Sequence, residues 1–291
     1  DAQPRVRARL QDAAATGALR FLVSAHAATE ELFVLKQLVE GLEGVGLAAA
    51  TVAWTRTDKP QPAGARFTVP PTDAPNVAGA RDLGYAVGPG NAGLPDLGEL
   101  RTAVESGAVK ALYVIDPGPA GTLGDVAWIA VARRSGVLPA LIVQGVLATE
   151  LTDAADIVLP GSAYVEKDAL YTNDQGRIQA TSRAIAPPGE ALEDWQILVA
   201  VGRSLGLALP YQTAGDVRAA LAAAMPGTGY ADADRLVFTR PVPARNWLQA
   251  SNPSERWKWD FLFQDLPPVK GHSVQMDALP VPGAAIPLKQ V

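Results

Sequence analysis

Apolar residues recur along this chain in two patterns, short continuous runs and longer stretches with helical spacing. Runs such as residues 112–115 (LYVI) and 141–143 (LIV) do not alternate with polar positions, which indicates strands buried on both faces. Elsewhere apolar residues return every three or four positions, as in Leu32, Leu35 and Leu38, which predicts amphipathic helices. Strands alternating with helices predict an α/β fold, with a Rossmann-like, mostly parallel sheet and helices on both faces.

The two patterns also locate the individual elements. The predicted strands are residues 18–24, 47–54, 111–115, 138–143 and 156–159. The predicted helices are residues 1–17, 29–42, 94–107, 125–136, 195–205 and 215–225, the first ending at Gly17 and the fourth capped by Asp125. Residues 55–76 carry too many prolines for regular structure and are expected to run extended into a short turn at Val77–Leu83.

The same pattern divides the chain into three segments. Residues 1–17 are a helical lead-in, residues 18–230 form the α/β domain, and residues 231–291 form a tail rich in proline and aromatic residues. The tail lacks the periodicity of a core-forming segment. Two interpretations stay open, a strap along its own domain or an arm on a partner subunit, because aromatic residues anchor interfaces. The aromatic residues in question are Trp247, Trp257, Trp259, Phe261 and Phe263.

The stretch Ala140–Trp195 is predicted to be a strand, a helical turn, a second strand that stops at Pro160, and a long ordered polar loop. Loops of this length inside a domain are usually functional or form a contact surface. Glu166, Lys167 and Asp168 are adjacent in it, and such a cluster is more typical of a solvated or salt-bridged surface than of an acid–base pair.

Composition removes several classes of function. The net charge of −5 and a pI near 5.1 argue against nucleic acid as a partner. The absence of cysteine excludes disulfides and cysteine-ligated iron–sulfur clusters, and with only His26 and His272 we expect no metal site. No apolar run approaches the length of a spanning helix, and no signal peptide is evident. A start at Asp1 is typical of a processed product or of one segment of a longer polypeptide.

Candidate catalytic chemistry is sparse, and we predict no catalytic residue. The chain has no G-x-S-x-G elbow and no phosphate-binding P-loop. His26 follows a predicted strand at the sheet edge where ligands bind, so it is either a ligand contact or an exposed loop histidine. Residues 88–93 (GPGNAG) spell a G-x-G-x-x-G motif, but they lack the flanking strand and helix of a dinucleotide site, which favours a tight turn.

One long pattern in this chain resembles the molybdopterin oxidoreductase superfamily, which includes formate dehydrogenases and the large iron–sulfur subunit of NADH:quinone oxidoreductase (complex I), known as the G-type or 75 kDa subunit. The resemblance covers roughly residues 18–208 and is closest to the C-terminal part of the complex I subunit. It rests on Thr149–Glu150, Ala155–Pro160, Glu166–Lys167, Asn173, Gly176–Arg177, Gln179 and Pro187–Trp195, supported upstream by residues 25–38 and 88–98.

Two departures from the superfamily pattern bear on the cofactor. Members that carry molybdenum or tungsten usually have an Asp after the strand held here by Leu141–Val143 and a Gly-x-Asn-Pro turn after the preceding strand. This chain has Gln144–Gly145 and Asp116–Pro119 in those places. Those loops normally help to hold the guanine nucleotide ends of the pterin. We also expect no β-barrel cap of the kind that catalytic members carry, because only a helix or two and the proline-rich tail follow Trp195. We therefore expect no cofactor in this chain. If a pterin is retained, the resemblance implies contacts from Asp116, Gln144, Thr149, Glu150 and Asn173.

The resemblance implies a non-catalytic, structural part of the G-type component of complex I in the peripheral arm. Expected partners are other peripheral-arm subunits and an adjoining cysteine-rich iron–sulfur region, on the cytoplasmic side of the inner membrane (the matrix side if mitochondrial). The stretch Ala140–Trp195 would then be a retained scaffold held by packing and by Glu166, Lys167, Asn173 and Arg177. The alternatives are the pterin-binding part of a formate dehydrogenase-like enzyme with molybdopterin guanine dinucleotide, and a small-molecule binder on a Rossmann-like sheet.

Overall fold

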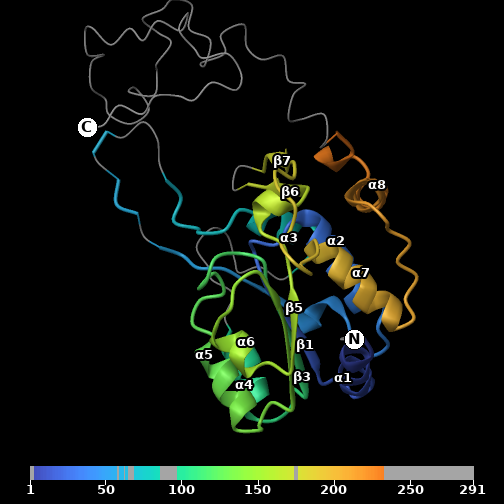
Figure 1. The fold of residues 1–291 in the computed structure, drawn as a ribbon. Helices are drawn as coiled ribbons and strands as arrows, with labels where there is room; N and C mark the ends of the chain where they lie inside the picture. Colours follow the sequence, from blue (N-terminus) through green and yellow to red (C-terminus); the bar gives the residue numbers. More distant parts are fainter. Residues whose placement is uncertain are drawn as a thin grey trace, which may run out of the picture. The chain divides into compact units, whose positions relative to one another are not determined.

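Five parallel strands form the central sheet in the order β2-β1-β3-β4-β5, which confirms the predicted fold class (Figure 1). The strands are β1 (Leu19–Ser24), β2 (Ala50–Ala53), β3 (Ala111–Asp116), β4 (Ala140–Gly145) and β5 (Ile157–Pro160). The computed structural model describes residues 3–57, 59–61, 63–64, 69–85, 97–173 and 176–232. The chain divides into the units Asp1–Val237 and Phe238–Val291, and all the described residues belong to the first.

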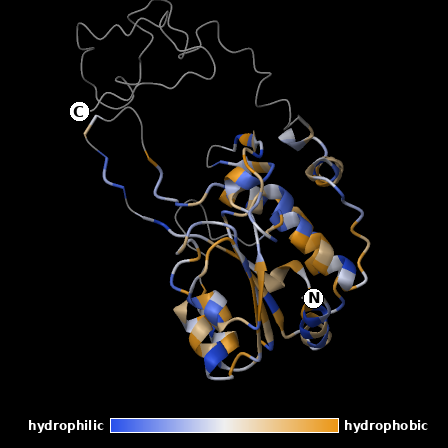
Figure 2. Cartoon of the chain, viewed as in Figure 1, coloured by the Kyte–Doolittle hydropathy of each residue, from blue (hydrophilic) through white to orange (hydrophobic). Residues whose placement is uncertain are grey.

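Helices cover both faces of this sheet (Figure 1). One layer contains α1 (Gln3–Ala15), α2 (Thr29–Gly41), α7 (Asp194–Ser204) and α8 (Ala214–Ala224), and the other contains α4 (Gly98–Glu105), α5 (Ala127–Arg134) and α6 (Glu150–Ala154). Strand residues alternate between the layers: Tyr113 and Ile142 face the first, whereas Val114 and Leu141 face the second. Figure 2 shows apolar residues concentrated on the strands and on the helix sides that meet them.

The expected long loop of residues 161–193 contains an antiparallel hairpin that the sequence pattern did not predict. Its strands are β6 (Ala169–Thr172) and β7 (Ile178–Thr181), preceded by a 3-10 turn at Tyr164–Glu166. Gly176 in the connection has a φ of 72°, which favours glycine. β6 lies against α2 and against the short helix α3 (Val77–Asp82). This hairpin therefore packs on the α2 layer instead of forming an open loop.

Three short elements differ from the predicted ones at their boundaries or caps. The predicted strand 47–54 begins as a 3-10 turn, Leu47–Ala49, before β2, and the predicted turn near Val77 is the helix α3. Asp125 is not the cap of α5, because Val126 occupies that position; its carboxylate accepts the N–H of Ala127 at 3.4 Å.

Helical segments lie near both ends of the described part of the chain. Gly17 follows α1 with a φ of 67°, as expected for a helix-ending glycine. Val6 and Leu10 of α1 are buried in the core of the α/β domain, and a further 3-10 turn lies at Gly229–Asp232. The GPGNAG motif and the tail beyond residue 232 lie outside the described residues. Among the described helices, none is long and apolar enough to cross a membrane.

Candidate functional site

Polar side chains meet where β1 and β3 end, which is the point at which the strand order reverses. Ser24 Oγ donates to Thr122 Oγ1 at 3.0 Å, and Thr122 in turn donates to the carboxylate of Asp116. His26 Nδ1 lies 3.4 Å from Ser24 Oγ. In open α/β sheets this reversal point is the usual ligand site. Ser24, His26, Asp116 and Thr122 therefore form the first candidate site, here called the switch-point cluster.

The switch-point cluster is closely packed. His26 lies in a turn but is half-buried, so the interpretation of His26 as an exposed histidine is wrong. A Cβ at Gly118 would lie 2.8 Å from His26 Cγ and 2.9 Å from Thr122 Cγ2, so side chains already fill the loop after β3. Burial raises the pKa of Asp116 to about 6, and burial lowers the pKa of His26 against the opposing charge of Asp73.

A second cluster lies in the interior between the sheet, α2, α7 and the hairpin. Lys167 Nζ donates to Glu31 Oε1 at 2.5 Å and to Asp194 Oδ2 at 3.0 Å. The three side chains are at most 1% exposed. Buried charges are retained in proteins only when they are paired and hydrogen-bonded. We call Glu31, Lys167 and Asp194 the buried ionic cluster.

Sheet residues extend the buried ionic cluster. Gln144 Nε2 donates to Asp194 Oδ1 at 2.9 Å, and Tyr113 Oη donates to Gln144 Oε1 at 2.6 Å. Both side chains are completely buried. Both the oxygen and the nitrogen of the Gln144 amide are thus hydrogen-bonded to other side chains of the protein.

Neighbouring polar contacts attach β6 to the helices. Glu30 accepts the N–H of Leu170 at 2.9 Å and Arg218 Nε at 2.6 Å. Asn76 Oδ1 accepts the N–H of Thr172 at 2.8 Å. Buried carboxylate and amide side chains therefore satisfy the free edge of β6, which water cannot reach there.

The environment of the buried ionic cluster raises the pKa of Lys167 and the pKa of Glu31. Burial alone would lower the pKa of Lys167, but Asp194 and Glu31 outweigh it and raise that pKa. Burial raises the pKa of Glu31 to about 7, with Lys167 opposing and Asp194 adding to the effect. The lysine is thus fully charged at neutral pH, whereas Glu31 exchanges a proton near neutrality.

The structure corrects the interpretation of Glu166, Lys167 and Asp168 as a surface cluster. Lys167 is 1% exposed and points into the core, while its neighbours make separate backbone contacts. Glu166 accepts the N–H of Ala163 at 2.9 Å, and Asp168 accepts the N–H of Arg183 at 2.8 Å. The signal that could have indicated burial of Lys167 is that apolar residues flank the charged run on both sides, at Val165 and at Ala169–Leu170.

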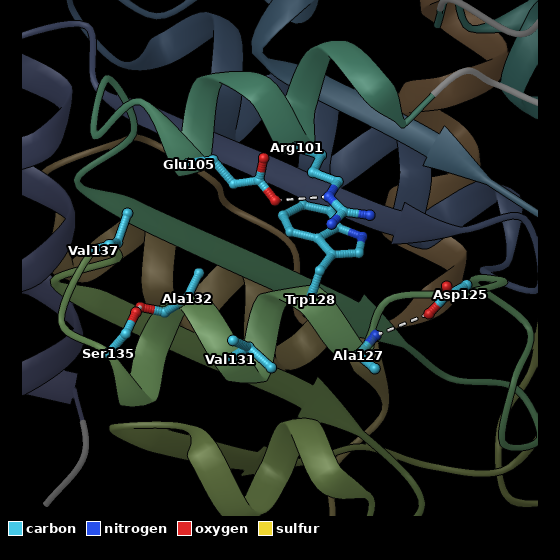
Figure 3. A pocket seen from close by; sticks show the side chains of 9 residues that line it. All are labelled: Arg101, Glu105, Asp125, Ala127, Trp128, Val131, Ala132, Ser135 and Val137. Carbon is cyan, nitrogen blue, oxygen red and sulfur yellow. Dashed lines mark hydrogen bonds and ion pairs between the residues drawn. The ribbon is translucent and has the colours of Figure 1, made fainter.

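A pocket of about 400 Å³ lies away from both clusters, between α4 and α5 (Figure 3). Trp128 lies across it from α5, with the side chains of Arg101 and Glu105 on the α4 side. Arg101 and Glu105 form an exposed ion pair at 2.7 Å. None of the residues that line this pocket belongs to the switch-point cluster or to the buried ionic cluster. Among the described residues, no group of three or more histidine or acidic side chains could hold a metal ion.

Comparison with known proteins agrees with this architecture. Residues 93–204 match the family model described as molybdopterin oxidoreductase. The chain therefore contains a segment that is similar to molybdopterin oxidoreductases. In the described residues, the match runs from α4 to α7 and includes Lys167, Gln144 and Asp194.

Individual relatives of this domain come from two kinds of enzyme. The chain is 41% identical over 103 residues to the F420-dependent formate dehydrogenase subunit alpha of Methanocaldococcus jannaschii, covering 35% of this chain and 15% of that protein. It is 52% identical over 64 residues to the NADH-ubiquinone oxidoreductase 78 kDa subunit of Candida albicans, covering 22% and 9%, and 45% identical over 78 residues to that of Neurospora crassa, covering 27% and 10%. The matches thus span at most 15% of these relatives.

The five residues implied as pterin contacts are distributed over the segment that matches the family model. Asp116 belongs to the switch-point cluster and Gln144 to the buried network. Thr149 begins α6, Glu150 pairs with Arg134 at 2.8 Å on the surface, and Asn173 accepts the N–H of Arg177 at 2.9 Å in the hairpin turn. These residues therefore do not converge on one site.

These residues, as placed, do not fit the nucleotide ends of a pterin cofactor. Gln144 is 0% exposed and already bonded at both ends of its amide, and the loop at Gly118 is filled by His26 and Thr122. Phosphates are bound by basic side chains and backbone N–H groups, whereas Asp116 offers a carboxylate. At the ends of β3 and β4 the described side chains therefore offer a carboxylate and an amide that is already bonded, and the loop at Gly118 has no room for a further group.

Proposed function

We propose that this chain is a non-catalytic, structural part of an NADH:quinone oxidoreductase of the complex I type, in the peripheral arm. The observation that carries the proposal is the side chain of Gln144, which is buried and bonded to Tyr113 and Asp194. The resemblance expects cofactor contacts at this position. The similarity to the 78 kDa subunits supports the choice of complex.

In this role the α/β domain holds neighbouring polypeptide in register and carries no electrons itself. The proposed partners are other peripheral-arm subunits and a cysteine-rich region that binds the iron–sulfur clusters. The location proposed with it is the cytoplasmic side of the inner membrane, or the matrix side in a mitochondrion. The buried ionic cluster supports a scaffold role, because it uses charged side chains to fix three segments that are distant in sequence.

The test is metal and activity analysis of the native assembly. An affinity-tagged full chain is expressed in its own host, and the purified assembly is analysed for molybdenum, tungsten and iron. We expect iron from partner polypeptide, NADH-dependent quinone reduction, and neither molybdenum nor tungsten at the level of this chain. Molybdenum or tungsten in stoichiometric amount would overturn the proposal.

The second candidate is the pterin-binding part of a formate dehydrogenase-like enzyme with molybdopterin guanine dinucleotide. It is favoured by the 103-residue match to the Methanocaldococcus jannaschii protein, which is longer than the matches to the 78 kDa subunits. The same purified assembly separates the two candidates. Formate-dependent dye reduction together with bound molybdenum or tungsten would favour this enzyme, whereas NADH-dependent activity alone would favour the scaffold.

A further inference from the structure

The buried ionic cluster contains two carboxylates and one ammonium group. Glu31 comes from α2, Asp194 from α7, and Lys167 from the segment that leads into β6. All three side chains are at most 1% exposed. With every group ionised, the cluster would hold one uncompensated negative charge out of contact with water, which is strongly unfavourable.

Among the described residues, no other group near the cluster supplies the missing positive charge. On α2 itself, Glu30 faces the same region, but Arg218 of α8 pairs with it at 2.6 Å. From β6, the phenol of Tyr171 interacts with Glu31 and Lys167, and from β3 the phenol of Tyr113 lies near Asp194; both phenols are neutral at physiological pH. Asp116, at the end of β3, also interacts with Asp194, but as a carboxyl group it supplies no positive charge. Gln144 of β4 contributes an uncharged amide. The charge is therefore balanced most simply by one proton bound within the cluster.

We propose that the buried ionic cluster is a proton-dependent latch that holds the β6–β7 hairpin on α2 and α7. With one proton bound, the cluster is neutral and the segment around Lys167 stays closed. When the proton is lost, the closed state contains a buried net charge, and the hairpin opens more often. The latch depends only on this chain's own contacts and not on the proposed function.

The direction of the pH effect follows from linkage. Burial raises the pKa of Glu31 from its ordinary value of 4.5 to about 7, and an open hairpin returns it toward 4.5. The closed state therefore binds the proton more tightly. Its advantage is complete below pH 4.5, decreases as pH rises, and is lost above about pH 7. Lys167 stays protonated throughout, because the two carboxylates raise its pKa.

Amide hydrogen exchange of the full chain at pH 6 and pH 8 tests the latch. The probes are the N–H groups of Leu170 and Thr172 in β6, and the reference is Val114 in β3. After correction for intrinsic exchange, the pKa change predicts about tenfold less protection of the β6 probes at pH 8 than at pH 6. Val114 should change much less, because the sheet does not open with the hairpin. Equal protection of β6 at the two pH values would overturn the proposal.

A pair of matched variants on α2 assigns the effect to Glu31. In Glu31→Gln the pH dependence of β6 protection should disappear. In the control Glu40→Gln it should remain about tenfold, because Glu40 is 46% exposed and pairs with Lys36 on the same helix. A Glu31→Gln protein that keeps the full pH dependence would contradict the assignment.

A measurement on the unmodified protein covers the case in which Glu31→Gln does not fold. Glutamate carboxyl carbons are labelled with carbon-13 and followed by NMR from pH 4 to pH 9. One glutamate carboxyl should titrate near pH 7, the value expected for Glu31. If every glutamate carboxyl titrates below about pH 6, Glu31 holds no proton at neutrality and the latch, which depends on Glu31, is refuted.

Discussion

The two faces of the central sheet are built from similar apolar strand positions but are stabilised in different ways. Leu112, Val114, Leu141 and Val143 meet α4, α5 and α6 in an almost wholly apolar layer. Its ion pairs keep contact with solvent: the side chains of Arg134 and Glu150 are 51% and 54% exposed, and those of Arg133 and Asp156 are 27% and 13% exposed. The opposite face, toward α2 and α7, places a buried lysine between two buried carboxylates.

This difference shows that burial of apolar surface stabilises one face, whereas the other is stabilised both by apolar burial and by ion pairs between specific side chains. Apolar packing is non-directional, so the α4–α5 layer tolerates changes of equal volume. Charged side chains in the interior must find defined partners, so the α2–α7 face fixes the hairpin in one position.

Lys167→Met should cause the largest loss of stability. Methionine has similar volume but leaves Glu31 and Asp194 buried without a cation, and breaking such a pair costs about 3–5 kcal/mol. Denaturant unfolding of the full chain at pH 7 measures the change. The matched control is Arg134→Ala on the other face, where an exposed pair contributes less than about 1 kcal/mol. Similar losses for both variants would remove the proposed difference between the faces.

Leu141→Ala tests the apolar face. Leu141 is 0% exposed and faces α5 and its neighbours, so truncation should cost roughly 3 kcal/mol through lost burial and the cavity left behind. Because no charge is involved, the loss should be the same at pH 6 and pH 8. A loss that depends on pH would show that the two faces are coupled through the sheet.

Much of the fold followed from periodicity in the sequence. The positions of Leu141 and Tyr113 in buried runs predicted strands covered on both sides, because apolar contact depends on spacing that is local in the chain. The family pattern around Lys167 also located the important stretch. Helical spacing likewise predicted α2 and α7, although their ends differ by a few residues.

The partners within the buried ionic cluster could not be predicted in this way. Glu31 and Lys167 are 136 residues apart, and a charged residue in a sequence is on average a surface residue. The hairpin was missed although residues 169–172 and 178–181 flank a turn containing Gly176, because each strand has only four residues. Tertiary contacts with α2 and α3 decide both features.

Asp116→Asn should have an intermediate, pH-dependent effect at the carboxyl end of β3. Burial raises the pKa of Asp116 from 3.8 to about 6, so the folded state binds its proton more tightly than the unfolded state. The native protein should therefore lose about 1 to 2 kcal/mol more than the variant as pH rises from 4 to 6, because other buried carboxyl groups such as Glu31 titrate in both proteins. Urea unfolding across this range measures it. Identical pH profiles for the two proteins would show that Asp116 titrates normally.

The smallest effect is expected for Arg177→Glu, in contrast to the sequence-based hypothesis that Arg177 helps to hold the stretch Ala140–Trp195. The side chain of Arg177 is exposed, and its backbone N–H, which the substitution keeps, donates to Asn173 Oδ1 at 2.9 Å. Surface substitutions of this kind change stability by less than about 0.5 kcal/mol. Parallel unfolding of Arg177→Glu and Lys167→Met compares two basic residues of one segment, one outside the core and one inside it. A loss above about 2 kcal/mol for Arg177→Glu would place part of the charge-based stabilisation on the hairpin surface.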